Sequence, residues 1–265
     1  MVSAGLGFRI PRLFETESSF TEFRDALTLI KQHGFLGVEL NLGTANQGAL
    51  RRIHGEVRQQ RLRIAAVGTG QVFVANGLSL TDSATRERAV ATVKGLTRFA
   101  SDEEAVLIIG MVRGGVSPEG DRMKLLRQSL VECDKAAAEL EVRIALEPIN
   151  RYETSLLNTA AEVDTLIREE KLAATGVLLD TFHMNIEEQS IERTIRAHHA
   201  RITHFHIADS NRWPPGNGHL RLGQLLKLLE DLGYDRWVST ESLPKPDSTR
   251  AVEETAHFLT TNRFL

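Results

Sequence analysis

The sequence predicts an α/β fold, a single (β/α)8 TIM barrel that spans residues 1–265. Eight short apolar runs alternate with longer amphipathic stretches, which is the pattern of strand–helix units built on a parallel sheet. Eight such units in 265 residues favour a closed barrel over an open sheet. No linker, low-complexity segment or break in composition divides the chain, so we expect one domain.

The predicted strands are short and apolar, and most show no alternation of polar and apolar residues. This is expected of parallel strands that are buried on both faces. Residues 177–179 illustrate the pattern, because they are wholly apolar and stop abruptly at Asp180. In chain order the predicted strands are residues 5–10, 36–41, 62–68, 105–112, 142–147, 175–180, 202–208 and 237–241.

The predicted helices carry apolar residues at helical spacing. In the first, Phe20 and Leu27 lie on one face, and Gly34 follows as a C-cap residue. In the sixth, we expect Glu187 and Glu188 in the first turn, where carboxylates complement the helix dipole. In chain order the predicted helices are residues 20–33, 47–60, 84–100, 121–140, 159–170, 187–199, 222–232 and 250–259.

Composition and charge limit the location and the partners. The chain is 42% hydrophobic and 25% charged, which is ordinary for a globular protein. Its net charge of −3 argues against a nucleic-acid partner, because such surfaces are usually basic. Cys133 is the single cysteine, so no intramolecular disulfide forms and a reducing compartment is expected. The N-terminus lacks a charged region followed by an apolar segment, so we expect no signal peptide, and no apolar run approaches the roughly 18 residues of a membrane span. We therefore expect a cytoplasmic protein with no membrane partner.

Four residues at the ends of four consecutive predicted strands point to a metal site. In a barrel all strand carboxyl ends share one face, so Glu147, Asp180, His206 and Glu241 are expected to converge there. Three carboxylates and one imidazole suit a divalent cation, with Mn²⁺ favoured over Co²⁺ or Mg²⁺. We interpret His204, on the same face as His206, as an interior residue with a hydrogen-bond partner, not as a fifth ligand.

This arrangement predicts proton transfer next to a carbonyl group. A metal held by carboxylates can bind a ketone and its neighbouring hydroxyl, and stabilise the enediolate that forms when a proton leaves the carbon between them. Glu147 and Glu241 can lie on opposite faces of the substrate, so that one removes a proton and the other returns it with inversion. His183 could orient the carbonyl and Arg212 could bind the same oxygens. The long loop 210–219 could cover the site.

Three segments carry a resemblance to a known family: residues 147–153 (EPINRYE), 180–188 (DTFHMNIEE) and 206–219, completed by Glu241. Over nearly its whole length the chain resembles the D-tagatose 3-epimerase-like (ketose 3-epimerase) branch of the xylose isomerase-like barrels. The resemblance implies a small-molecule ketose substrate, two-glutamate proton transfer, and a homodimer or homotetramer. It also implies a metal, usually Mn²⁺, on Glu147, Asp180, His206 and Glu241, with Glu153, His183 and Arg212 holding substrate oxygens.

Two further segments, residues 67–71 (VGTGQ) and 108–114 (IIGMVRG), look closest to a subgroup that includes a 5-keto-L-gluconate epimerase. That substrate and its product, D-tagaturonate, carry a carboxylate. Arg113 and Arg9, at or near predicted strand ends, could bind it. Alternatively, each arginine pairs with an acidic residue such as Glu39. The sequence supports a carboxylated and a neutral ketose substrate almost equally, with a slight preference for the acid. The roles of Arg9 and Glu39 stay open.

Other functions on the same scaffold remain in competition. An aldose–ketose isomerase of the hydroxypyruvate isomerase type moves the proton between adjacent carbons, and an inosose dehydratase expels water. An endonuclease IV-like enzyme would need more histidine ligands and a basic groove. A non-catalytic sugar-binding barrel would not need all the candidate ligands. No predicted strand ends in lysine, so a Schiff base is not expected, and no nucleophile elbow is present.

Overall fold

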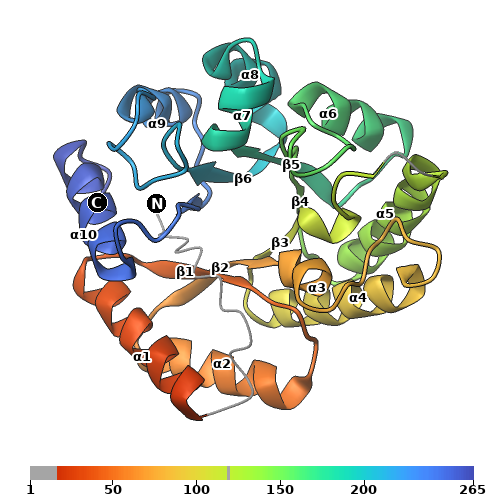
Figure 1. Ribbon diagram of the computed structural model, residues 1–265, viewed down its shortest axis with the longest axis horizontal. Coiled ribbons are helices and arrows are strands. Elements are labelled where there is room, and N and C mark those ends of the chain that lie inside the picture. The colour runs from red at the N-terminus through yellow and green to blue at the C-terminus, as the bar shows by residue number, and fades with distance from the viewer. Residues whose placement is uncertain (1–16, 118–119) are drawn as a thin grey trace.

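The computed structural model describes residues 17–117 and 120–265, and within them seven parallel strands form one sheet in the order of the chain. Figure 1 shows these strands around a central axis, with the helices outside them, in a nearly closed barrel. The predicted TIM-barrel fold is therefore confirmed. The predicted strand at 5–10, which includes Arg9, lies outside the described residues.

The strands are short, with three to six residues each. Between neighbours the pairing is parallel throughout, with register shifts at Val38/Glu39 and Val177/Leu178. The strands are β1 Gly37–Asn41, β2 Arg63–Gly68, β3 Val106–Ile109, β4 Ile144–Leu146, β5 Thr175–Asp180, β6 Ile202–Ile207 and β7 Val238–Thr240. The predicted strand at 105–112 was too long, because Gly110 turns the chain into the short helix η1 and Val112 is buried in that turn.

Helices follow the strands and cover the outside of the sheet (Figure 1). They are α1 Glu17–Gln32, α2 Gln47–Gln59, α3 Gly70–Val74, α4 Arg86–Asp102, η1 Met111–Arg113, α5 Arg122–Glu139, α6 Ala160–Glu169, α7 Thr181–Glu187, α8 Ile191–His198, η2 His199–Arg201, α9 Leu222–Asp231 and α10 Ser248–Thr261. No helix among the described residues is long and apolar enough to cross a lipid bilayer.

The predicted helix at 187–199 starts too early, because α8 begins at Ile191 and a separate helix precedes it. A helix, α7, starts directly after β5 because Asp180 caps it, accepting hydrogen bonds from the backbone N–H groups of Phe182 and His183 at 2.6 and 3.2 Å. Glu187 therefore ends a helix, and its carboxylate binds Arg151. Glu188 follows the helix, and its carboxylate instead accepts from the N–H at the start of α6.

The alternation of side chains along the strands separates two cores. The larger core lies between the sheet and the helices, whereas Ala66, Ile108, Ala145 and Leu178 form a small separate cluster. Leu178 pairs in register with His204, so these residues face the barrel interior from adjacent strands. Two residues further along each strand, the same face presents a second layer, and this layer contains the predicted ligands.

Candidate metal and active site

The four predicted metal ligands converge at the carboxyl ends of the strands. One ligand atom from each of Glu147, Asp180, His206 and Glu241 lies within 4.8 Å of the others, and we call this group the metal-ligand cluster. His206 Nδ1 is central: it lies 3.5 Å from Asp180 Oδ2, 3.7 Å from Glu147 Oε1 and 3.4 Å from Glu241 Oε2. Asp180 and His206 are paired in register on β5 and β6, which fixes their proximity.

These residues fit a divalent cation. Glu147 Oε1, Asp180 Oδ2 and His206 Nδ1 are buried and have no hydrogen-bond partner among the described residues. Such buried polar atoms are costly unless a ligand satisfies them. Two atoms that each bind one cation at about 2.1 Å lie roughly 3.0–3.5 Å apart. The distances from His206 Nδ1, 3.4–3.7 Å, are close to that range. Three carboxylates also leave an excess of negative charge that a cation would balance.

The surroundings of the two glutamates of the cluster shift their pKa values in opposite directions. Burial raises the pKa of Glu147, and the neighbouring Glu241 carboxylate raises it further. Burial would also raise the pKa of Glu241, but the positive charges of Arg212 and His206 outweigh it and hold this pKa well below the usual range. A bound cation would favour the ionised form of both carboxylates.

The two carboxylate oxygens of Asp180 have different contacts. Its Oδ1 accepts hydrogen bonds from the first turn of α7, whereas its Oδ2 faces His206. The cap fixes the carboxylate plane, so the second oxygen is directed into the metal-ligand cluster without loss of rotamer freedom at binding. The same side chain thus starts a helix and presents an oxygen to the metal-ligand cluster.

A network of polar side chains borders the cluster. His183 Nε2 lies 3.8 Å from Glu147 Oε1, and its Nδ1 contacts the Asn150 side-chain amide at 2.8 Å. Asn150 also donates to Glu153, which accepts a hydrogen bond from Arg212 at 3.0 Å. The structure thus brings together the three residues predicted to hold substrate oxygens: Glu153, His183 and Arg212.

Arg212 connects this network to the cluster. Its Nη2 lies 3.2 Å from Glu241 Oε2, and its guanidinium stands 5.0 Å from the centre of the Phe182 ring. Burial would lower the pKa of Arg212, but Glu241, Asp180 and the other carboxylates raise it above the ordinary value. Arg212 therefore stays charged, and its guanidinium stays fixed beside Glu241.

The predicted role of Arg113 in substrate binding is corrected. Its side chain is fully buried, and its guanidinium donates to the backbone carbonyls of Glu147 and Leu157. Burial lowers its pKa to about 10, so it remains a cation at neutral pH. In this position Arg113 supports the segment that carries Glu147, and its side chain has no exposed surface. Its predicted pairing with Glu39 is also absent: Glu39 binds two histidines.

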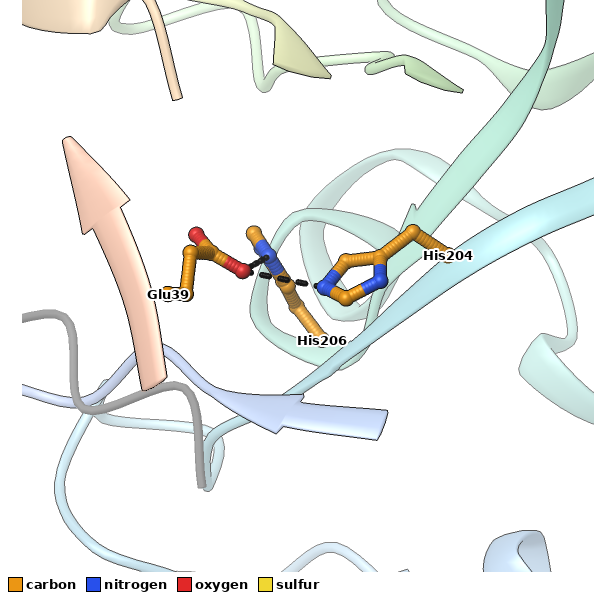
Figure 2. A group of neighbouring side chains, drawn as sticks. All are labelled: Glu39, His204 and His206. Atoms are coloured by element: carbon orange, nitrogen blue, oxygen red, sulfur yellow. Dashed lines mark hydrogen bonds and ion pairs between the residues drawn. The ribbon is translucent and has the colours of Figure 1, made fainter. Parts of the chain in front are cut away.

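Those histidines are His204 and His206, and both direct Nε2 at one oxygen of Glu39, at 2.9 and 3.0 Å. Figure 2 shows Glu39 reaching from β1 to the two imidazoles on β6. As predicted, His204 is buried and hydrogen-bonded, and Ser239 Oγ is a further partner at 2.8 Å. Its Nδ1 has no partner among residues 17–117 and 120–265.

The loop predicted to cover the site is ordered around Asp209. This buried carboxylate accepts backbone hydrogen bonds from Ser210, Gly216 and Leu220 at 2.8–3.1 Å. Gly218 leaves room for it, since a side chain there would collide with Asp209 Oδ1. The loop therefore holds Arg212 through a compact backbone, with Trp213 partly exposed.

Comparison with known proteins decides the family. The family model for the xylose isomerase-like TIM barrel matches residues 27–261. The chain belongs to this family. The D-psicose 3-epimerase of Enterocloster bolteae is 28% identical over 247 residues, which cover 87% of this chain and 80% of that protein. The 3-dehydro-D-guloside 4-epimerase of Escherichia coli K12 is 32% identical over 146 residues, and the match covers 55% of each chain.

Solved structures of sugar epimerases share the fold. The 3-keto-D-glucoside 4-epimerase YcjR from Escherichia coli superposes with a TM-score of 0.81 at 20% identity over 98% of both chains. The D-allulose 3-epimerase from a Methylomonas species, in complex with D-allulose, has a TM-score of 0.81 at 19% identity, over 98% of this chain and 96% of that chain. The predicted resemblance to sugar epimerases of the xylose isomerase-like family is confirmed.

Some features of this xylose isomerase-like barrel were not predicted from its sequence. Glu39 was noted as a strand-end residue, but its partners come from a distant strand, and no local pattern indicates them. The same holds for Phe182 beneath Arg212. Asn150 carried a signal, since it follows a strand end three residues after Glu147, and it forms the contact between His183 and Glu153.

Proposed function

We propose that this chain is a metal-dependent carbohydrate epimerase that inverts a carbon next to a ketone. The observation that carries the proposal is the metal-ligand cluster, in which three buried atoms lack hydrogen-bond partners within the described chain. Relatives named as 3-epimerases and 4-epimerases support it, because both reactions invert a carbon beside a carbonyl group. The E. coli 4-epimerase match spans only about half of that relative, so its particular substrate is not carried over.

In this proposal Glu147, Asp180, His206 and Glu241 would hold a divalent cation, which would polarise the ketone and the neighbouring hydroxyl and so make the proton on the carbon between them more acidic. Glu147 and Glu241 then act as the proton-transfer pair from β4 and β7. One carboxylate removes the proton from one face, and the other returns a proton to the opposite face, which inverts the centre. Exchange of these roles runs the reaction in reverse.

The bordering network orients the substrate. His183 is buried to 2% exposure beside Glu147, and Asn150 fixes its ring, so its Nε2 can contact a substrate oxygen from a defined direction. Arg212 Nη1 lies 3.0 Å from Glu153 Oε1, and the pair offers a substrate one hydrogen-bond donor group, the guanidinium, and one acceptor group, the carboxylate. Pre-organisation of this kind reduces the entropy lost when the sugar binds.

A neutral ketose is the substrate class that we propose. Two arginines were predicted to bind a substrate carboxylate. Arg113 donates its hydrogen bonds to backbone carbonyls instead, and Arg9 lies outside the described residues. Arg212 already pairs with two carboxylates. A keto-uronate such as 5-keto-L-gluconate or D-tagaturonate therefore has less support than the sequence suggested, and it serves as the competing substrate in the test.

The cation that we propose is Mn²⁺, with Co²⁺ and Mg²⁺ as alternatives. Carboxylate-rich sites favour these ions over Zn²⁺, and one imidazole favours Mn²⁺ or Co²⁺ over Mg²⁺. Metal analysis of purified protein, followed by removal with a chelator and reloading with each ion, identifies the preferred one. The homodimer or homotetramer implied by the resemblance remains a prediction for light scattering.

The test of the function is product analysis with the Mn²⁺-loaded chain. Candidate substrates are D-psicose, L-ribulose and D-tagatose as neutral ketoses, and D-tagaturonate as a keto-uronate. We expect epimer formation, followed by chromatography and ¹³C NMR, with at least one neutral ketose and loss of activity after chelation. An aldose product would instead indicate an isomerase of the hydroxypyruvate isomerase type. Loss of water from an inosose would indicate a dehydratase. The absence of any product would reject the proposal.

A further inference from the structure

We propose that Glu39 is a positioning residue that sets the tautomer and the ring orientation of His206 for cation binding. This inference rests on the metal site of the proposed function, but not on the identity of the sugar. Glu39 lies on β1, 167 residues before His206, and contributes no atom to the metal-ligand cluster. It acts, in this proposal, only through the imidazole of His206.

The geometry assigns the ring proton of His206. Its Nε2 lies 3.0 Å from Glu39 Oε2, and an ionised carboxylate accepts hydrogen bonds but does not donate them. Nε2 therefore carries the proton. In the neutral ring Nδ1 then carries the lone pair, and Nδ1 is the atom 3.4–3.7 Å from the three carboxylates of the cluster. The carboxylate thus selects the form of the imidazole that can bind a cation.

His204 holds the carboxylate in place. Its Nε2 lies 2.9 Å from the same oxygen of Glu39 and 2.8 Å from Ser239 Oγ, so Glu39 Oε2 has two ring nitrogens as partners (Figure 2). The two imidazoles also meet edge to face, at 86° with 5.1 Å between ring centres. This contact hinders rotation of the His206 ring. Glu39 and His204 therefore constrain His206 from two directions.

The same three side chains could instead hold a second cation, since their ligand atoms are also close together. In that arrangement His206 would bridge two ions through both ring nitrogens and would have to lose its last ring proton. Hydrogen bonds at 2.9 and 3.0 Å require no such loss, and they leave Nδ1 free for the metal-ligand cluster. The positioning role is therefore the simpler account, and metal stoichiometry separates the two.

The first experiment measures Mn²⁺ affinity without any substrate, from the EPR signal of free Mn²⁺ during titration of the chelator-treated chain. We expect one ion per chain for the wild type. In Glu39→Gln the side chain keeps its size but loses its charge, and we expect affinity to fall about 10–100-fold, the usual effect of removing such a partner. The matched control is Asp134→Asn, which alters a buried carboxylate that accepts three hydrogen bonds around the start of β5, and it should bind as the wild type does.

A second pair of variants covers the case in which Glu39→Gln does not fold. His204→Phe keeps a ring but removes the donor to Glu39, whereas His204→Gln keeps a donor near that position. We expect Mn²⁺ affinity to fall in the first and to recover at least partly in the second. Long-range ¹H–¹⁵N spectra of histidine-labelled, Mg²⁺-loaded protein add a direct readout, and should find His206 protonated at Nε2 and unprotonated at Nδ1.

Several outcomes overturn the inference. Unchanged affinity in Glu39→Gln and His204→Phe, or a proton on Nδ1 of His206 in the loaded wild type, contradicts it. Two ions per chain, one of them lost in Glu39→Gln, assigns Glu39 to a second site instead. If the wild type binds no cation, the metal site fails together with the proposed function. If the wild type binds Mn²⁺ and the variants respond as expected but no sugar is epimerised, only the proposed function fails.

Discussion

Glu147 reaches the metal-ligand cluster because the residue at the end of the neighbouring strand is a glycine. A Cβ at Gly110 would collide with Glu147 Oε2 and would lie 3.4 Å from Ile149 Cδ1. A residue with a side chain therefore has no room at this position beside Glu147. The apolar run before Gly110 predicted a strand but could not indicate this contact, which depends on β3 and β4 lying side by side.

We predict that Gly110→Ala displaces the Glu147 carboxylate and reduces kcat/KM at least about 100-fold, as expected for a catalytic group moved by about 1 Å. The matched control is Gly55→Ala in α2, where a Cβ meets nothing within 4 Å. This control should keep full activity and gain about 0.5–1 kcal/mol of unfolding free energy. Steady-state kinetics and urea unfolding measure both effects. Equal activity in Gly110→Ala and the wild type would contradict the predicted contact.

A second prediction at this scale concerns Cys133. The side chain is fully buried on α5, and burial raises the pKa of its thiol to about 12. At pH 8 the thiolate, which is the reactive form, is therefore nearly absent. We expect no reaction with a thiol-specific disulfide reagent in the native chain, and one equivalent after unfolding in guanidinium. Rapid labelling of the native chain would contradict the burial of Cys133.

At the scale of elements, the sequence predicted most strands and helices but misplaced the segment after β5. The amphipathic run at 187–199 suggested one helix, whereas Asp180 starts α7 six residues earlier and Ser190 caps a separate α8. Asp180 was predicted as a ligand, so its second role as an N-cap was overlooked. Residues at a strand end that are also good N-cap residues can serve both functions, and only the three-dimensional structure separates them.

The loop after β6 gives the prediction at this scale. Asp209 binds three backbone N–H groups of the loop, and its removal leaves them without a partner. We expect Asp209→Ala to lose about 1–3 kcal/mol of unfolding free energy and to expose the loop. Trypsin should then cleave after Arg212 or Arg221 faster than in the wild type.

The matched control for the loop is Asp247→Ala, which removes the side-chain cap of α10 and should lose about 1 kcal/mol. It leaves the bonds of Asp209 intact, so trypsin cleavage after Arg212 should stay as slow as in the wild type. If the two variants are cleaved equally fast in the loop, general destabilisation explains the effect and Asp209 has no special role in ordering it.

At the scale of the whole molecule, the barrel brings together ligands that are far apart in the chain. The sequence predicted this convergence because the parallel strand order fixes which ends meet, so Glu147, Asp180, His206 and Glu241 followed from topology alone. It could not predict which of the other polar residues lie above the site and which are buried in the wall. For this reason Arg113 was predicted to bind substrate although it is buried, and the role of Glu39 stayed open.

Cation binding should stabilise the whole fold, because the four candidate ligands come together only in the folded chain. At a free Mn²⁺ concentration of about 100 times Kd, the gain is about 2.7 kcal/mol. For a chain of this size that corresponds to a rise in Tm of roughly 5–11 °C. Differential scanning calorimetry with and without a chelator measures it. Glu241→Gln, which lacks one ligand, should gain much less, and an equal gain in this variant would place the ion elsewhere.

The central claim is that Glu147 and Glu241 exchange a proton on a carbon next to a ketone. The direct test is incubation of the Mn²⁺-loaded chain with a ketose substrate in D2O, followed by NMR of the recovered sugars. The account predicts that the epimer formed carries deuterium at the inverted carbon, and that Glu147→Gln and Glu241→Gln lose this conversion by at least about 100-fold. An epimer without deuterium, or full conversion by either variant, would contradict the two-glutamate mechanism.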